Sequence, residues 1–287
     1  MTRTRPFRQV DVFGATAFGG NPVAVVLDGE GLDEVGMQRI ARWTNLSETT
    51  FVLPPTTGDA DYRVRIFTPG GELPFAGHPT LGTAHAWLEH GGRPRDEGVV
   101  VQECMAGLIE VRRDGQRLAF AAPPTRRSGP IDEPALSRFV NALGIDREQV
   151  IGHQWVDNGP GWSALRLADA QQVLDLAPDF SGLPDVMLGV LGTHPPGSER
   201  ARAGHAYELR AFAPRIDVAE DPVTGSLHAS VAQWLVHNGL APAGGLWTAT
   251  QGTRLGRSGV VTLEVDEAGA VWVGGATTTV IAGTIEA

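Results

Sequence analysis

The sequence predicts an α+β fold with two pseudo-symmetric halves, each a mainly antiparallel β-barrel around one central α-helix. Three observations lead to this prediction. A nine-residue pattern at 78–86 returns at 221–229, half a chain later. Each copy continues into a helical run that is apolar on most sides, and such a helix belongs in the interior. Most of the expected strands follow one another through short turns, which is typical of antiparallel sheets.

The repeat extends well beyond these nine residues. Its shared core is Pro-x-x-Gly-[Thr/Ser]-x-His-Ala, and its first residue is His78 in one copy and Asp221 in the other. Each copy follows a Phe-x-Pro segment and leads into Trp-Leu-x-His, and the later stretch 102–107 resembles 251–256. Repetition on this scale indicates a duplicated domain. Because histidine and aspartate can both carry a proton, we expect an asymmetric site inside a symmetric frame.

The chain has 287 residues, a comfortable length for two domains. The stretch 122–130 is rich in turn formers, has no periodicity, and is the best candidate for a linker. We therefore expect an N-terminal barrel-helix half over 1–125 and a C-terminal half over 126–287, with the option that the last strand crosses to the first half.

In the first half, strands are expected where polar and apolar residues alternate or where a short apolar run ends in turn residues. These strands are 8–13, 23–27, 50–53, 62–67, 99–101, 108–111 and 118–121. An amphipathic helix is expected over 32–43, where Leu32, Val35 and Ile40 have helical spacing. The first repeat helix is expected over 79–90.

In the second half, an Asp132 cap and a Gly144 stop predict a helix over 132–143. A short helix is expected over 169–176, and the second repeat helix contains the apolar run 227–235. The expected strands are 162–167, 185–191, 208–212 and 260–265.

The composition excludes several classes of protein. A hydrophobic content of 42% and a charged content of 20% are ordinary for a globular protein. The net charge of −10 argues against a nucleic-acid binder. No apolar run is long enough to cross a membrane and no signal-peptide core follows the basic N-terminus, so a cytoplasmic location is expected. Every basic residue is arginine, which excludes a lysine Schiff base with pyridoxal phosphate.

The two repeat helices are the first candidates for a binding site. A proline at the first helical position, with His78 or Asp221 just before it, is typical of a helix start. The N–H groups expected to point outward belong to Leu81, Gly82, Thr224 and Gly225. Such N–H groups favour an anion such as a carboxylate, and the two glycines would allow its close approach. In the alternative interpretation, Asp221 is only a helix cap.

Glu48 is the second candidate, because it lies between a predicted helix and an apolar strand. Neighbours Leu46 and Phe51 could remove water from its carboxylate, which would raise its pKa towards neutrality and suit it to general acid–base catalysis. Its position in the sequence fits a solvated loop glutamate as well.

No metal or nucleotide site is expected. His85 and His90 are five residues apart, and His228 and His237 are nine apart, so neither pair shares one helical face. The sequence contains no HExxH, Cys-x-x-Cys, GxGxxG, P-loop or Gly-x-Ser-x-Gly motif. Cys104 is the only cysteine, so there is neither an internal disulfide nor a thiol pair.

The motifs together resemble the PhzF (phenazine biosynthesis-like) family. They cover nearly the whole chain in the family's order, at 11–13, 19–25, 45–49, 75–80, 220–226, 251–252 and 256–257. The resemblance implies a fold similar to that of diaminopimelate epimerase, with two barrel-helix halves, and a homodimer. It also implies an isomerase that needs no cofactor. The family's best-understood member converts trans-2,3-dihydro-3-hydroxyanthranilate to its keto tautomer by moving a proton between ring carbons.

The resemblance also assigns site residues. The family's catalytic glutamate falls on Glu48, and its supporting histidine and aspartate fall on His78 and Asp221. Its substrate-contacting positions fall on Ser47, Gly77, Gly225 and Ser226. The residues that would shape the pocket and match no family position include Trp155, Trp162 and His205. The mechanism is therefore implied, whereas the substrate stays open.

Two alternatives remain beside the proton-moving isomerase. One is an epimerase or racemase of a small carboxylate that uses Glu48, and the other is a binding or interaction protein without turnover. An epimerase with two catalytic thiols, one at each helix start, is unavailable, because Cys104 lies elsewhere.

Overall fold

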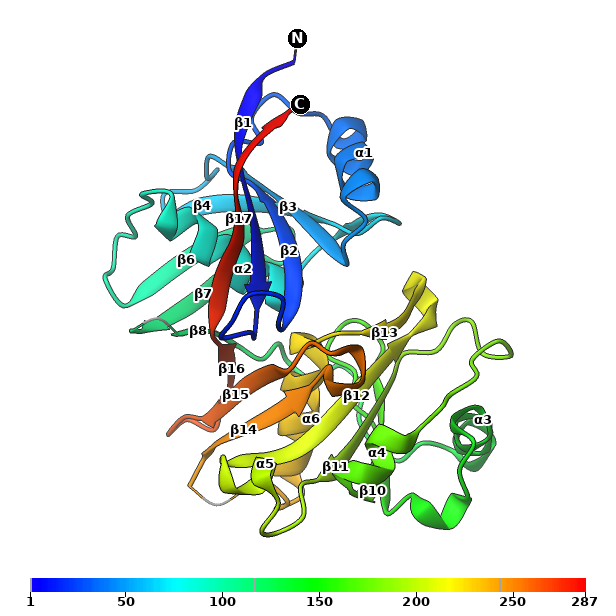
Figure 1. The fold of residues 1–287 in the computed structure, drawn as a ribbon. Coiled ribbons are helices and arrows are strands. Elements are labelled where there is room, and N and C mark those ends of the chain that lie inside the picture. Colours follow the sequence, from blue (N-terminus) through cyan, green and yellow to red (C-terminus); the bar gives the residue numbers. More distant parts are fainter. Residues whose placement is uncertain (1, 116, 243) are drawn as a thin grey trace. The chain divides into compact units, whose positions relative to one another are not determined.

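The computed structural model describes residues 2–115, 117–242 and 244–287. The chain divides into two compact units (Figure 1), and each is described by itself. The first unit comprises Met1–Ala121 and Gly274–Ala287, and the second comprises Ala122–Val273. No helix in the described ranges is both long and apolar enough to cross a membrane.

The first unit is built from strands and two helices. Its strands are β1 (Thr4–Val12), β2 (Asn21–Val26), β3 (Glu48–Leu53), β4 (Tyr62–Phe67), β5 (Glu72–Leu73), β6 (Val99–Cys104), β7 (Gly107–Asp114), β8 (Arg117–Ala121) and β17 (Thr277–Glu286). Its helices are α1 (Glu34–Thr44) and α2 (Gly77–Glu89). The last strand of the chain, β17, pairs antiparallel with β1 along its whole length, and the two run side by side in Figure 1.

In the part of this unit that the structure describes, all strand pairs but two are antiparallel. Strand β2 is parallel to β3, and β4 is parallel to β6. A parallel pair needs a crossover connection, and α1 and α2 supply these two crossovers. These two crossovers contain the helices that were expected over 32–43 and 79–90.

Helix α1 begins and ends where its sequence dictates. The Asp33 side chain accepts a hydrogen bond from the Gly36 N–H, which caps the first turn. Asn45 ends the helix in the left-handed conformation with φ 53°, which asparagine tolerates better than most residues. The buried side of α1, with Met37 and Ile40, packs on the first unit's core.

Helix α2 is the centre of the first unit. It is apolar around most of its circumference and packs against β1, β2, β3, β6, β7, β8 and β17. Gly82 lets it approach β2 closely, because a Cβ at this position would lie 2.3 Å from Val23 Cγ1. This glycine therefore serves helix–strand packing within the unit, and the expected role of Gly82 in admitting a ligand is wrong.

The second unit contains α3 (Glu133–Leu143), β9 (Gly152–Trp155), β10 (Ser163–Asp169), α4 (Ala170–Asp175), β11 (Leu188–Thr193), α5 (Glu199–Arg202), β12 (His205–Ala213), β13 (Val218–Asp221), α6 (Gly225–His237), β14 (Leu246–Gln251) and β15 (Gly259–Val265). Strand β16 (Val271–Gly275) spans the boundary between the units. Parallel pairs β10–β11 and β12–β14 are joined through α4 and α6. The two crossovers of the first unit are thus repeated.

Side-chain contacts repeat as well. Arg65 on β4 binds both carboxylate oxygens of Glu72 on β5, at 2.7 and 2.5 Å. Arg210 on β12 binds Glu220 on β13 in the same way, at 2.9 and 2.7 Å. Each arginine also lies over the ring of the phenylalanine two residues further along its strand. Each pair therefore fixes the short strand that precedes a repeat helix.

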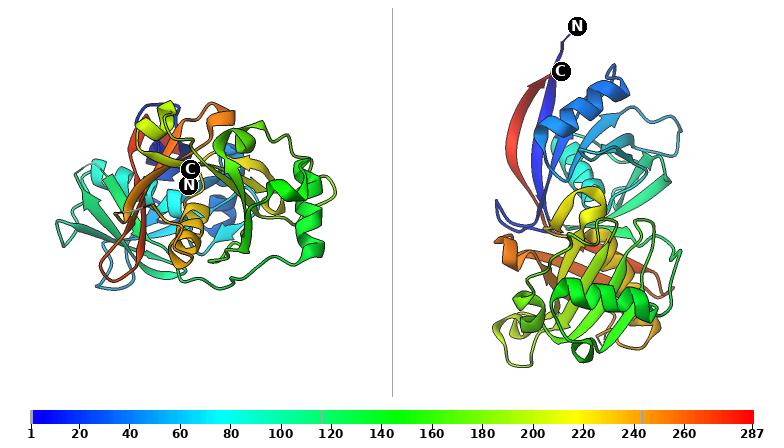
Figure 2. Two further views of the ribbon diagram at one scale, coloured as in Figure 1. Left: turned by 90° about the horizontal axis from the view of Figure 1, so that it is seen from below. Right: turned by 90° about the vertical axis from the view of Figure 1, so that its right-hand side faces the viewer.

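Helix α3 covers one side of the second unit's strands (Figure 2). Its predicted bounds are confirmed, since Asp132 caps its start through the Ala135 N–H and Gly144 ends it with φ 68°. Buried side chains such as Leu136 and Phe139 pack against strand residues including Val190, which closes the hydrophobic core of this unit.

Candidate active site

Glu48 and His78 lie next to each other in the first unit. Glu48 opens β3 and His78 is the second residue of α2, and Glu48 Oε2 lies 3.2 Å from His78 Nε2. The two residues are only 9% and 5% exposed. Glu48 belongs to a buried strand, so the alternative of a solvated loop glutamate is wrong.

Burial determines the protonation of His78. It lowers the pKa of His78 to about 3, although a hydrogen bond between the imidazole and the Pro22 carbonyl acts in the opposite direction. The ring is therefore neutral near pH 7 and has a single N–H. With that N–H on the Pro22 carbonyl, Nε2 faces Glu48 as an acceptor. Glu48 Oε2 and His78 Nε2 thus face each other as two acceptors when Glu48 is ionised, an arrangement that one proton can bridge.

Neighbouring contacts fix both backbones. The Thr83 hydroxyl of α2 bonds the Thr50 hydroxyl of β3 at 2.8 Å, one turn away from the pair. Gly77 allows the start of α2 to lie against Phe120, because a Cβ there would come within 2.4 Å of the ring. Ser47 immediately precedes Glu48 and is partly exposed.

Helix α2 begins earlier than its sequence suggested. Its first residue is Gly77, two residues before the proline, and the Thr80 N–H already bonds the Ala76 carbonyl at 3.1 Å. Leu81 and Gly82 lie inside the helix, where N–H groups bond the preceding turn. The expectation that these two N–H groups point outward is therefore wrong.

The second repeat helix begins later. Asp221 is the last residue of β13, and α6 starts at Gly225 with Thr224 as its N-cap residue. Asp221 thus lies three residues before the cap position, and the interpretation of Asp221 as a helix cap is wrong. The prediction that Pro222 occupies the first helical position is wrong too, so the two repeats start their helices at different points.

Gln251, at the end of β14, explains this difference. Its side-chain oxygen accepts the Thr224 N–H at 2.9 Å, so this N–H does not point outward as expected. Its amide group donates to the Asp221 carbonyl oxygen at 2.8 Å. The Thr224 hydroxyl donates to Asp221 Oδ2 at 2.5 Å. These contacts keep 221–224 out of the helix and fix the carboxylate of Asp221.

Ser226, in the first turn of α6, is held from two sides. Trp162 Nε1 donates to its hydroxyl at 3.0 Å, and Asn158 Nδ2 donates to its carbonyl at 3.0 Å. Trp162 and Asn158 are almost fully buried. The sequence singled out Trp162 without a partner and missed Asn158, whose only signal is its place in a glycine-rich turn just before Trp162.

Trp155, His205 and Cys104 are engaged elsewhere. Trp155 packs edge-on to Phe139 and carries the Arg127 guanidinium over its ring at 3.6 Å. His205 bonds the Thr248 hydroxyl at 2.8 Å. Cys104 ends β6, and burial raises the pKa of its thiol, which makes it a poor nucleophile.

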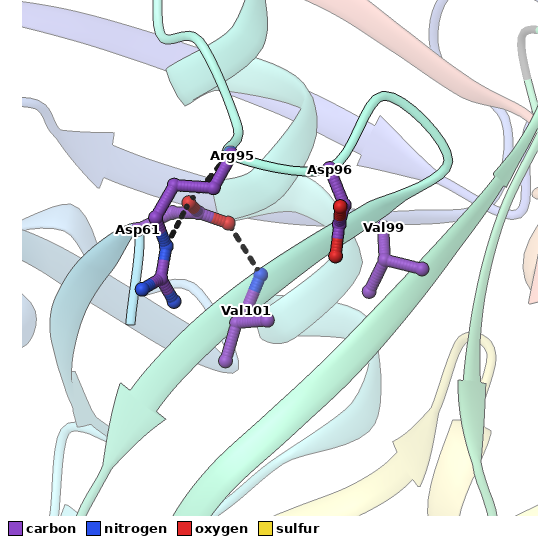
Figure 3. Close-up of a pocket in the computed structure, with 5 residues that line it drawn as sticks. All are labelled: Asp61, Arg95, Asp96, Val99 and Val101. Carbon is purple, nitrogen blue, oxygen red and sulfur yellow. Dashed lines mark hydrogen bonds and ion pairs between the residues drawn. The ribbon is translucent and has the colours of Figure 1, made fainter. Parts of the chain in front are cut away.

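A hollow of about 260 Å³ lies in the first unit, around Asp61 and Arg95 (Figure 3). The Asp61 carboxylate accepts the backbone N–H groups of Val101, at 2.7 Å, and of Arg95, at 3.1 Å. The Asp61 carboxylate thus links β6 to the loop that precedes it. The residues that line this hollow do not include those predicted for the active site.

The family model for phenazine biosynthesis-like proteins matches residues 10–283. The chain belongs to the phenazine biosynthesis-like family. Antisense-enhancing sequence 1 of Schizosaccharomyces pombe is 40% identical, over 96% of this chain and 97% of that protein. The trans-2,3-dihydro-3-hydroxyanthranilate isomerase of Pseudomonas fluorescens is 35% identical, over 86% of each chain.

Solved structures agree with this membership. A phenazine biosynthesis protein of Enterococcus faecalis superposes with a TM-score of 0.79 at 27% identity, over 99% of both chains. A hydroxyproline epimerase of Agrobacterium vitis has a TM-score of 0.59 at 11% identity, over 99% of this chain and 93% of that one, and shows the fold alone. The protein thus has a mixed α/β fold rich in sheet. Several of its relatives are named isomerases, and it is an isomerase.

Proposed function

We propose that this isomerase moves a proton within a small carboxylated, dihydroaromatic substrate and that Glu48 carries the proton. The observation that supports this proposal is the buried contact of 3.2 Å between Glu48 and His78. Two relatives, 35% identical to this chain, are named trans-2,3-dihydro-3-hydroxyanthranilate isomerases, which makes that compound the first substrate to test.

In the proposed reaction, the Glu48 carboxylate removes a proton from an acidic ring carbon. The electron pair of the broken C–H bond moves into the conjugated system of the substrate. Glu48 then delivers the proton to another ring carbon, where a new C–H bond forms. Substrate and product have the same atoms, so the step needs no other reactant. Neutral His78 stabilises the protonated glutamic acid by accepting its hydrogen bond, which keeps the proton in place between the two transfers.

We assign the binding of the substrate's polar groups to the remaining predicted residues. Gly225 and Ser226 begin α6, a helix of 13 residues whose N-terminus favours a carboxylate. Because Trp162 donates to the Ser226 hydroxyl, the proton of that hydroxyl is available to a ligand. Asp221, as a carboxylate, suits an amino or hydroxyl group, and the family positions at Ser47 and Gly77 complete the assignment.

We also propose that each unit is a mainly antiparallel barrel around its helix and that both share one plan. The packing of α2 against strands on many sides supports this arrangement in the first unit. The repeated crossovers and the repeated arginine–glutamate pairs support the common plan. The predicted domains, 1–125 and 126–287, follow the same interpretation, with the last strand, β17, crossing to the first half to pair with β1.

The test is incubation of the purified protein with trans-2,3-dihydro-3-hydroxyanthranilate in deuterated water, followed by NMR. We expect conversion to the keto tautomer and loss of the proton at the attacked carbon. Inversion of a small chiral carboxylate without formation of the tautomer would support an epimerase instead. Saturable binding of the compound without any exchange of its protons would contradict the catalytic role of Glu48.

A further inference from the structure

A closed network of hydrogen bonds surrounds Asp221 in the second unit. Gln251 Oε1 accepts the Thr224 N–H at 2.9 Å. Gln251 Nε2 donates to the Thr224 hydroxyl at 3.0 Å and to the Asp221 carbonyl at 2.8 Å. The Thr224 hydroxyl bonds Asp221 Oδ2 at 2.5 Å. Gln251 is fully buried and Thr224 is 7% exposed, so water does not compete with these bonds.

The network has one consistent direction. Both hydrogens of the Gln251 amide group are used, one on the Asp221 carbonyl and one on the Thr224 oxygen. The Thr224 oxygen therefore already accepts a hydrogen, and its own proton points to the Asp221 carboxylate. A hydroxyl held as a donor stabilises the ionised carboxylate and disfavours its protonated form.

We propose that Gln251 and Thr224 are positioning residues that keep the Asp221 carboxylate ionised and in a single orientation for the substrate. The inference rests on the proposed function, in which Asp221 binds a polar group of the substrate. Neither residue needs to contact the substrate, since both act through Asp221.

The first repeat provides an internal comparison. Its matching glutamine, Gln102, also donates to a threonine hydroxyl, that of Thr80 at 3.0 Å. Its oxygen accepts the Tyr62 hydroxyl at 3.0 Å. The residue at the position of Asp221 is His78 there, which has no carboxylate to hold. In both repeats the glutamine donates to a threonine hydroxyl, but the two threonines are not matching positions, since Thr80 matches Val223. Of the two, Thr224 is the one bonded to the carboxylate of the residue that begins its repeat.

Other titratable groups lie near the network, on α6, on β13 and in the segment after β14. His228 on α6 is buried, and burial lowers its pKa to about 3, so it stays neutral near pH 7. Glu220, beside Asp221 on β13, is held by Arg210. Arg257 lies beside Gly252, which follows Gln251 in the chain, and an arginine stays charged.

The experiment compares four variants of the full chain. Thr224→Val and Gln251→Glu break the network at two different atoms, while Thr224→Ser keeps the hydroxyl. Thr248→Val is the matched control. Thr248 lies on β14, the same strand as Gln251, and its hydroxyl bonds Gly204 and His205. Circular dichroism checks that each variant folds.

Two readouts are measured. The first is the pH titration of the Asp221 carboxyl carbon by NMR without substrate, with Asp221→Asn identifying its signal. The second is kcat/KM for trans-2,3-dihydro-3-hydroxyanthranilate. In Thr224→Val and Gln251→Glu, we expect the titration midpoint to move to higher pH and kcat/KM to fall roughly tenfold, a usual effect of losing a hydrogen bond to a charged group. Thr224→Ser and the control should match the wild type.

The two readouts separate this inference from the proposed function. A shifted titration in Thr224→Val supports the network even if the wild type does not convert the compound, and in that case the proposed function alone fails. An unshifted titration in both folded network variants overturns the inference. In an Asp221→Asn background, Thr224→Val should cause no further loss of turnover, and a second full loss would show that Thr224 does not act through Asp221.

Discussion

Glu48 and His78 are held together by one short segment of β2. Glu48 lies opposite Val23 in the parallel pair of β2 and β3, and the His78 ring bonds the carbonyl of Pro22, the residue next to it. Val23 also contacts the first turns of α2 through Gly82. The Pro22–Val23 backbone therefore fixes the distance between the two side chains, which explains why this segment belongs to the motif.

Glu48→Gln tests the proton carrier. Glutamine keeps the size of the side chain but cannot accept a proton, so turnover should fall by roughly 10² to 10⁴, the usual range for general acid–base catalysis. Substrate affinity and fold should persist. Glu110→Gln, on an exposed part of β7, is the control and should leave turnover unchanged. Wild-type turnover in Glu48→Gln, with normal deuterium incorporation, would remove Glu48 from the mechanism.

Stability should decrease in acid. Burial lowers the pKa of His78 and of His228 to about 3, from an ordinary value of 6.5. Below pH 6.5 the unfolded chain binds a proton at each of them, whereas the folded chain does so only near pH 3. The free energy of unfolding should therefore fall with pH across this window, by at most about 1.4 kcal/mol per pH unit for each histidine.

Urea unfolding at pH 7 and at pH 4.5 measures this dependence. His228→Gln should make it shallower, because one of the two buried histidines is gone. His90→Gln, at an exposed position after α2, is the control and should keep the wild-type dependence. An unchanged dependence in His228→Gln would mean that His228 is not buried as a neutral ring.

Local signals predicted much of the fold, and long-range contacts account for what they missed. The cap at Asp132 and the stop at Gly144 gave α3 its correct bounds, because both signals act within the helix itself. The start of α6 was predicted incorrectly, because the side chain that holds the Thr224 N–H comes from Gln251, 27 residues away. The burial of Glu48 depends on the pairing of β2 with β3, which the spacing of residues does not reveal.

In the candidate site, too, sequence motifs predicted some residues, and contacts that form only on folding account for those that were missed. Motifs brought forward Glu48 and His78, which the structure brings together, and Asp221, which it places in the second unit. Sequence reasoning missed Asn158, because an asparagine in a glycine-rich turn carries no periodicity and no motif. Its contact with the Ser226 carbonyl exists only in the folded unit.

Gly82→Ala tests the packing of α2 on β2. The added Cβ would lie 2.3 Å from Val23 Cγ1, so the helix or the strand must move, which should cost about 1–3 kcal/mol of unfolding free energy. Gly71→Ala is the control, since a Cβ there meets nothing within 4 Å. Chemical denaturation measures both variants. Equal stability of Gly82→Ala and the wild type would contradict the close approach of α2 to β2.

Trp162→Phe tests whether the Ser226 hydroxyl is oriented for the substrate. Phenylalanine keeps most of the buried ring but loses the N–H that bonds Ser226 at 3.0 Å. The hydroxyl can then turn, and we expect KM to rise roughly tenfold, the effect of about one hydrogen bond, with a smaller change in kcat. Trp155→Phe is the matched control, because its ring packs with Phe139 in the core beneath α3. Both variants should lose similar stability in denaturation, and only Trp162→Phe should change KM. A rise in KM of the same size in the control would mean that packing, and not the hydrogen bond to Ser226, determines substrate binding.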